Sequence, residues 1–189
     1  MAYAGPLNDL IYQLAEHEVL KKQLKIRGTK SSAFATMLDG EYVLRFLTLS
    51  ESWKTFSGDL RRSMDDFMHA HRFANENEIA EFRERFTVAI EGCWSIWGER
   101  AFQRPAGSGW RAQALAGMYD AQMIAVAELS GPQREALYGR GPEATKAVRR
   151  LFQDRDFDSA VRQATNTPSR VRHRVRAISQ ALIDLLNED

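Results

Sequence analysis

Apolar residues recur along this chain at spacings of three and four, which is the period of one face of an α-helix. The clearest stripes comprise Leu7, Leu10, Ile11 and Leu14 near the start, and Val171, Val175, Ile178, Leu182 and Leu185 near the end. The alternation of apolar and polar residues that marks a strand is nearly absent. The pattern therefore predicts an all-α fold, a single irregular helical bundle of about seven to nine helices.

Glycine, proline and capping residues indicate where these helices begin and end. The expected helical segments are 6–24 in two parts, 38–53, 60–71, 77–97, 110–129, several shorter helices after residue 132, and 167–186. Residues 104–109 (RPAGSG) are the strongest internal break and predict a flexible loop, and 27–32 predict another loop. The chain has no internal repeat and no low-complexity tract, so we expect residues 1–189 to form a single helical domain.

Composition narrows the class of protein. The 189 residues are 44% hydrophobic and 27% charged, as in ordinary globular proteins, and the net charge of +1 favours neither a nucleic acid nor a membrane as partner. The single cysteine, Cys93, excludes an internal disulfide and fits a reducing compartment. No apolar run approaches the ~20 residues of a membrane span, and the first residues lack a secretory pattern. We expect a cytoplasmic protein without a membrane partner.

The sequence contains no complete catalytic motif. The four histidines lack zinc-binding spacing, the glycines form no phosphate-cradling loop, and Cys93 lies on an inward apolar stripe. We therefore expect no catalytic residue, no metal and no cofactor. One alternative is a metal-dependent helical hydrolase that uses Asp59, Asp65 and Asp66 with a divalent ion. The simpler interpretation of these three acids is a solvated helix face balanced by neighbouring arginines.

One arginine interrupts an apolar run. Arg45 is flanked by Val-Leu and Phe-Leu, and burying it unpaired would be costly, so it needs a specific carboxylate. Glu41 stands four residues before it, at the spacing of an intrahelical ion pair. Asp39 and an acid on a neighbouring domain are the other candidates. The residues alone leave open which of these acids pairs with Arg45.

Basic residues are concentrated near the end of the chain. Residues 140–176 contain ten lysines and arginines against four acids. The candidate DNA-binding residues are Arg149, Arg150, Arg170, Arg172, Arg174 and Arg176. On a helix the last four form two rows beside the apolar stripe, where they could contact successive phosphates. The alternative is that these arginines lie along the edge of the core and pair with nearby acids.

Five short segments, in this order, resemble one protein family. They are 3–10 (YAGPLNDL), 37–46 (MLDGEYVLRF), 58–68 (GDLRRSMDDFM), 97–102 (WGERAF) and 165–170 (TNTPSR). Together they resemble the C-terminal helical region of the domain of unknown function 262 family, which occurs in GmrSD-type modification-dependent restriction systems of bacteria. The matching segments extend over nearly the whole chain.

The resemblance implies a role in anti-phage defence. Such proteins combine a ParB/sulfiredoxin-like nucleotidase domain, marked by an Asp-Gly-Gln-Gln-Arg motif, with this helical region, and many add an HNH nuclease. Both motifs are missing here, so no catalytic residue is carried over. The resemblance further implies that Asp39, Glu41 and Arg45 contact the nucleotidase domain. The expected function is a non-catalytic module that braces a ParB-like nucleotidase through the helix of Glu41 and Arg45 and contacts double-stranded DNA through the last helix. A pure protein-interaction module without nucleic-acid binding is the alternative.

Overall fold

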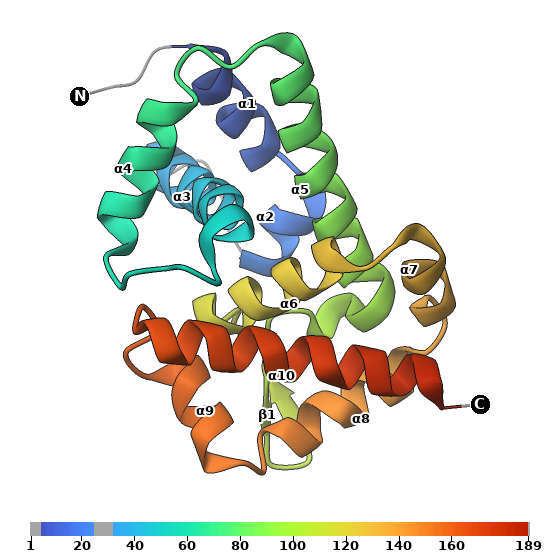
Figure 1. Cartoon of the computed structure of the whole chain (residues 1–189). Coiled ribbons are helices and arrows are strands. Elements are labelled where there is room, and N and C mark those ends of the chain that lie inside the picture. The colour runs from blue at the N-terminus through green and yellow to red at the C-terminus, as the bar shows by residue number, and fades with distance from the viewer. Residues whose placement is uncertain (1–4, 25–31, 189) are drawn as a thin grey trace.

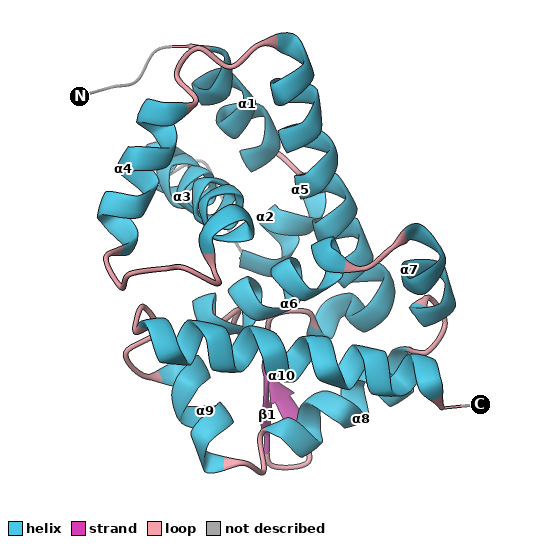
Figure 2. Ribbon diagram, viewed as in Figure 1, coloured by secondary structure: helices cyan, strands magenta, loops and turns pink. Residues whose placement is uncertain are grey.

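The computed structural model describes residues 5–24 and 32–188, and within these ranges the fold is all-α (Figures 1 and 2). The helices are α1 (Pro6–Ala15), α2 (Glu18–Leu24), α3 (Ser32–Ser52), α4 (Leu60–Ala70), α5 (Glu76–Trp97), α6 (Ala116–Glu128), α7 (Gly131–Leu137), α8 (Gly141–Leu151), α9 (Arg155–Arg162) and α10 (Pro168–Asn187). A short 3₁₀ helix, η2 (Gly98–Arg100), follows α5. The described part of the chain thus holds ten α-helices, close to the predicted number.

Polar side chains set the start of several helices. The carboxylate of Asp59 accepts a hydrogen bond from the Arg62 backbone N–H at 2.9 Å and caps α4. Asn75 and Glu78 form a reciprocal capping box at the start of α5. Such caps satisfy backbone donors that the first turn leaves free, and each contributes about 1 kcal/mol. These helices therefore begin close to the residues that the sequence predicts.

Helix α6 lies in the middle of the molecule, directly above α10 in the view of Figure 1. Every residue from Gly117 to Val126 is buried, because α3, α5, α9 and α10 all pack against this helix. Two glycines permit the close approach. A Cβ atom on Gly117 would lie 2.5 Å from the Val161 carbonyl oxygen, and one on Gly92 would lie 2.6 Å from Val126 Cγ1. Helix α6 is therefore the close-packed central helix of the fold.

A continuous set of buried apolar side chains runs from Leu7 on α1 to Leu185 on α10. In Figure 1 the helices α1–α4 lie above α6, α5 runs down beside it, and α8–α10 with the β-strands lie below it. Helix α6 therefore contributes to both halves of the core. None of the helices in the described ranges has the length and the apolar character needed to cross a membrane.

Residues 104–111 differ from the prediction. The segment predicted as a flexible loop forms an antiparallel hairpin of β1 (Arg104–Ala106) and β2 (Gly109–Arg111), in which Pro105 is paired with Trp110. Gly107 allows the turn, since its φ of +56° is readily adopted only by glycine. Helix α6 consequently begins at Ala116 rather than at 110. The predicted loop at 27–32 lies almost wholly outside the described residues.

Candidate nucleic-acid interface

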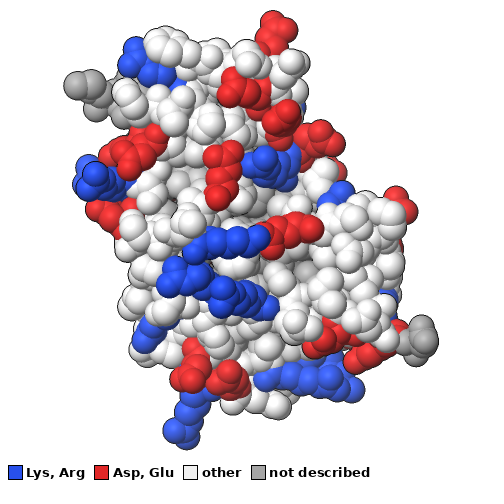
Figure 3. Space-filling model, viewed as in Figure 1, with Lys and Arg blue, Asp and Glu red and all other residues white. Residues whose placement is uncertain are grey.

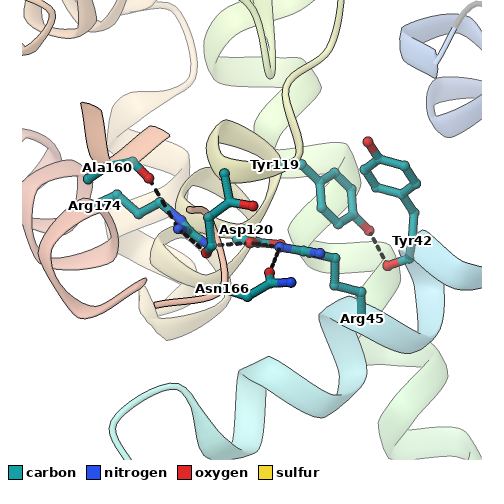
Figure 4. Close-up of polar contacts among 8 residues, drawn as sticks. Tyr42, Arg45, Tyr119, Asp120, Ala160, Asn166 and Arg174 are labelled. Carbon is teal, nitrogen blue, oxygen red and sulfur yellow. Dashed lines mark hydrogen bonds and ion pairs between the residues drawn. The ribbon is translucent and has the colours of Figure 1, made fainter. Parts of the chain in front are cut away.

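A buried carboxylate binds two arginines at the centre of the fold (Figure 4). Asp120 on α6 is 1% exposed. Arg45 on α3 donates from Nε to Asp120 Oδ1 and from Nη2 to Oδ2, both at 2.6 Å. Arg174 on α10 donates from Nη2 to the same Oδ2 at 2.5 Å. We call Arg45, Asp120 and Arg174 the central ion cluster, which joins three helices far apart in the sequence.

Further hydrogen bonds fix the orientation of the two guanidinium groups. Arg174 Nη1 donates to the carbonyl oxygens of Thr165 at 2.6 Å and Ala160 at 3.3 Å. Arg45 Nη2 also donates to Asn166 Oδ1 at 3.3 Å. The central ion cluster therefore anchors the connection between α9 and α10 as well as the three helices. Among the described residues Arg174 Nε has no hydrogen-bond partner.

The charges of the cluster determine its protonation. Burial alone would raise the pKa of Asp120, but Arg45 and Arg174 outweigh burial and hold the pKa of this carboxyl below its usual value. Burial lowers the pKa of Arg174, and Asp120 offsets only part of that effect. Asp120 is therefore an ionised carboxylate between two cations, and the three groups together carry one positive charge. The arrangement stabilises a specific helix packing and offers no open position for a substrate.

The predicted partner contact requires correction. Arg45 is 7% exposed and Asp39 is 2% exposed, so a partner domain cannot reach either side chain in this structure. The carboxylate that Arg45 needs is Asp120 of the same chain, neither Glu41 nor Asp39 nor an acid of another domain. Glu41 is exposed and remains available. The arginine faces inward because its ion pair with α6 compensates the cost of burial.

Asp39 is the second buried acid of the fold. Its Oδ1 atom has no hydrogen-bond partner among the described residues. Burial raises the pKa of Asp39 to about 6, while Lys21 lowers it and Glu16 raises it further by smaller amounts. A carboxyl with this pKa titrates close to neutral pH, whereas Arg45 and Arg174 hold the pKa of Asp120 below its usual value.

The last helix separates its arginines into two groups, which corrects part of the predicted DNA contact. Arg174 is fully buried in the central ion cluster. Arg170 is half-buried, and its Nη1 atom donates to Ser159 O and Oγ, both at 2.9 Å, and to Gln163 O at 2.8 Å. Both side chains hold α10 against α9, because backbone carbonyls and Asp120 provide their acceptors. Arg174 is therefore not free to bind a phosphate, and the Nη1 atom of Arg170 is already engaged.

The remaining arginines of α10 face outward. Arg176 is exposed and Arg172 is half-buried. They stand four residues apart, so they lie on one face about one helical turn from each other. Figure 3 shows basic side chains gathered over the N-terminal half of α10, whereas acidic side chains are frequent over α4 and α5. On α10, this surface is the part of the predicted DNA contact that the structure leaves accessible.

Arg149 and Arg150 on α8 have different surroundings. Arg149 donates to the carbonyl oxygens at the tip of the hairpin: Gly107 at 3.2 Å, Ser108 at 2.7 Å and Gly109 at 2.8 Å. Its guanidinium carbon also lies 5.0 Å from the centre of the Trp110 ring, within cation–π range. Arg150 is exposed. Arg149 thus fixes the hairpin tip against α8, and Arg150 remains free to meet solvent or a ligand.

A hollow of about 350 Å³ lies between the hairpin and the corner where α8 meets α9. Its wall includes Arg104, Arg149 and Arg162, one acid, Asp158, and the half-buried ring of Phe152. The sequence does not single out Arg104 or Arg162, because nothing in their spacing shows that the hairpin folds back onto α8 and α9. We call this feature the arginine hollow.

Asp120 was also missed from the sequence, although a signal was present. It is the sole charged residue between Ala116 and Ala127, a stretch otherwise rich in alanine and methionine. A single acid inside a helix that is apolar on all sides indicates a buried ion pair. The sequence also contains the two partners of Asp120: Arg45 interrupts an apolar run, and Arg174 lies in the last helix.

The acids of the alternative hydrolase do not converge. Asp59 caps α4, and Asp65 and Asp66 are exposed on the same helix, with Asp66 3.8 Å from Arg62. Within residues 5–24 and 32–188 no group of three or more histidine, cysteine or acidic side chains is arranged to hold a metal ion. Cys93 is buried, and burial raises the pKa of its thiol well above the usual value, which suits a core residue better than a nucleophile.

Comparison with known proteins gave no match: no family profile, no curated protein and no solved structure is significantly similar to this chain.

Proposed function

We propose that this chain is a non-catalytic helical module of a GmrSD-like modification-dependent restriction system, and that it binds duplex DNA through the outer face of α10. The observation that carries the DNA contact is the accessible pair Arg172 and Arg176 within a basic half of the chain. The defence role rests on the resemblance of the five short segments. We expect a ParB-like nucleotidase, as a domain or a subunit, to be the partner that supplies catalysis.

The distribution of charge supports a nucleic-acid ligand. Residues 100–176 contain 14 lysines and arginines and seven acids, whereas the other residues contain 12 and 18. The seven acids include Asp120, which is buried and cannot screen the surface. A cationic surface of this kind attracts the phosphate backbone, and Arg172 and Arg176 are spaced to meet neighbouring phosphates. The small net charge of the whole chain conceals this asymmetry.

The test is binding to a fluorescently labelled 20-base-pair duplex, measured by anisotropy at about 50 and 200 mM salt. We expect the Arg172→Ala/Arg176→Ala variant to bind roughly tenfold more weakly at low salt and to reduce the salt dependence by about two released counterions. The matched control is Arg61→Ala/Arg62→Ala, which removes two exposed arginines from α4. Absence of duplex binding, or equal losses in the two variants, would refute the DNA contact.

A second candidate function, a pure protein-interaction module, is favoured by exposed apolar side chains near the N-terminus. Tyr12 on α1 is 51% exposed and Leu38 on α3 is 38% exposed. Large exposed apolar side chains often mark a protein contact. The test is co-purification with a nucleotidase that carries the Asp-Gly-Gln-Gln-Arg motif and whose gene neighbours the gene for this chain. Loss of that complex in Tyr12→Ser/Leu38→Ser, with no duplex binding by the parent protein, would favour this candidate.

A further inference from the structure

We propose that the arginine hollow binds one nucleotide unit, with its phosphate on Arg104 and Arg162 and its base against Phe152. The inference rests on the proposed function insofar as a nucleic-acid strand supplies the nucleotide. A free nucleotide presents the same phosphate and base, so the experiment below separates the two sources. The site is distinct from the outer face of α10, because no residue of α10 lines the hollow.

The charge of the hollow calls for an anion. Three guanidinium groups line it, and Asp158 is the single acid among its lining residues. Asp158 Oδ2 accepts from Arg162 Nη1 at 2.9 Å, so its charge is already matched by one of the three arginines. Two positive charges therefore remain without an acid in the wall. A phosphate, which binds guanidinium groups through charge-assisted hydrogen bonds, fits this excess.

The arginines differ in how many donors they have left. Arg149 uses both of its terminal nitrogens on the hairpin carbonyls and so forms part of the wall. Within the described residues Arg104 makes one long hydrogen bond, from Nη1 to Pro105 O at 3.4 Å. Among these residues Arg162 also makes a single side-chain hydrogen bond, from Nη1 to Asp158 Oδ2 at 2.9 Å. Several N–H groups of Arg104 and Arg162 are thus available, and these two side chains are the ones assigned to the phosphate.

Phe152 supplies an aromatic surface beside these donors. Its ring packs edge-to-face on the buried ring of Phe157, with centroids 5.2 Å apart, and remains half-buried at the wall of the hollow. Because Phe157 fixes the ring of Phe152 and part of that ring is exposed, a nucleobase can stack on it at little cost in side-chain entropy. Sites that bind unpaired nucleotides commonly combine arginine donors with an exposed aromatic ring, as this hollow does.

The dimensions of the hollow limit the ligand. A space of about 350 Å³ accommodates a base with its sugar and phosphate but not a paired duplex. The ligand is therefore an unpaired nucleotide, from a single strand or free in solution. Stacking on Phe152 accepts any base, because every base has an aromatic face, so sequence preference should be slight.

The experiment uses the full chain and a labelled, short single-stranded oligonucleotide, with the unlabelled mononucleotide dAMP and inorganic phosphate as competitors. We expect Arg104→Ala/Arg162→Ala to weaken oligonucleotide binding about tenfold and Phe152→Leu, which keeps an apolar side chain, to weaken it roughly fivefold. The control Arg155→Ala removes an exposed arginine of α9 that does not line the hollow, and its affinity should stay within about twofold.

The competitors identify the source and the parts of the ligand. Competition by dAMP at concentrations comparable with the oligonucleotide supports a free nucleotide, and much tighter oligonucleotide binding supports a strand. Competition by phosphate as strong as by dAMP, together with unchanged binding in Phe152→Leu, overturns the nucleotide assignment. If Arg104→Ala/Arg162→Ala does not fold, as judged by circular dichroism, Phe152→Leu and dAMP competition against the parent protein decide the matter.

The two proposals fail separately. Duplex binding that depends on Arg172 and Arg176, with no single-strand binding at the hollow, removes the inference and leaves the proposed function intact. Single-strand binding that depends on Arg104, Arg162 and Phe152, with no duplex binding, removes the DNA contact of α10 and leaves the hollow.

Discussion

Arg45 binds both carboxylate oxygens of Asp120 from its Nε and Nη2 atoms, each at 2.6 Å, although the two residues are 75 positions apart in the chain. Arg174 completes the cluster by donating to one of the same oxygens. Paired buried ions add little net stability compared with apolar groups, but removal of one partner leaves the other charge uncompensated. The central ion cluster should therefore be far more sensitive to single changes than to a combined one.

Removing the shared carboxylate should destabilise the fold strongly. In Asp120→Asn two buried guanidinium groups lose their counter-charge, and we expect the free energy of unfolding to fall by about 3–5 kcal/mol. Urea denaturation followed by circular dichroism measures this change. Asp65→Asn, at an exposed position of α4, is the control and should change stability by less than about 0.5 kcal/mol. A loss below 1 kcal/mol in Asp120→Asn would contradict a buried, ionised cluster.

Replacing the whole cluster by apolar residues should restore much of that stability. Arg45→Met, Asp120→Leu and Arg174→Met together remove all three charges while keeping similar volumes. We expect the triple variant to unfold at a higher urea concentration than Asp120→Asn, and its loss to be smaller than the sum of the three single losses. Additive single losses would show that the three side chains act independently.

Asp39 should make stability depend on pH in the opposite sense from Asp120. Its folded pKa of about 6 lies above the ordinary 3.8, so the folded state holds this proton more tightly. The contribution is fully present below pH 3.8 and is lost as the pH rises through 6. Asp39→Asn should therefore gain stability relative to the parent at pH 8, by about 1–3 kcal/mol, and little at pH 4. Comparing the two proteins at each pH cancels the titration of other groups.

The close approach of α6 and α9 depends on the missing side chain of Gly117. A methyl group there would lie 2.5 Å from the Val161 carbonyl oxygen, which is backbone and cannot rotate away. Gly117→Ala should lower the free energy of unfolding by about 1–3 kcal/mol or more, since the two helices must separate. Gly131→Ala is a matched control, because nothing lies within 4 Å of its Cβ position. Equal melting temperatures for the two variants would contradict the tight packing.

Helix periodicity in the sequence predicted the fold class and most helices, because a helix with one buried face repeats its apolar residues every three or four positions. Elements without one buried face were placed less well. Helix α10 buries one face, so its apolar stripe gave nearly the observed bounds of Pro168–Asn187. Helix α6 is buried on all faces, which removes the periodic signal, and its start was placed six residues too early. The hairpin at 104–111 was missed because two strands of three residues are too short to show alternation.

The candidate site was less predictable because it depends on which helices meet. The need of Arg45 for a carboxylate followed from its apolar neighbours, but its partner lies on another helix and cannot be found from spacing. Arg174 was grouped with the surface arginines, although it stands three residues after Val171 and four before Ile178 and so shares their buried face. Applying the same stripe to the charged residues would have placed it in the core.

The position of Arg174 also has a consequence for the order in which the chain acquires its structure. Asp120 is synthesised 54 residues before Arg174, so on the ribosome α6 emerges while the last helix is still unmade. Until α10 arrives, one flank of α6 has neither its apolar cover nor the second cation for its carboxylate. Final consolidation of the centre therefore waits until α10 has been synthesised, and the helices that precede α6 shield it until then.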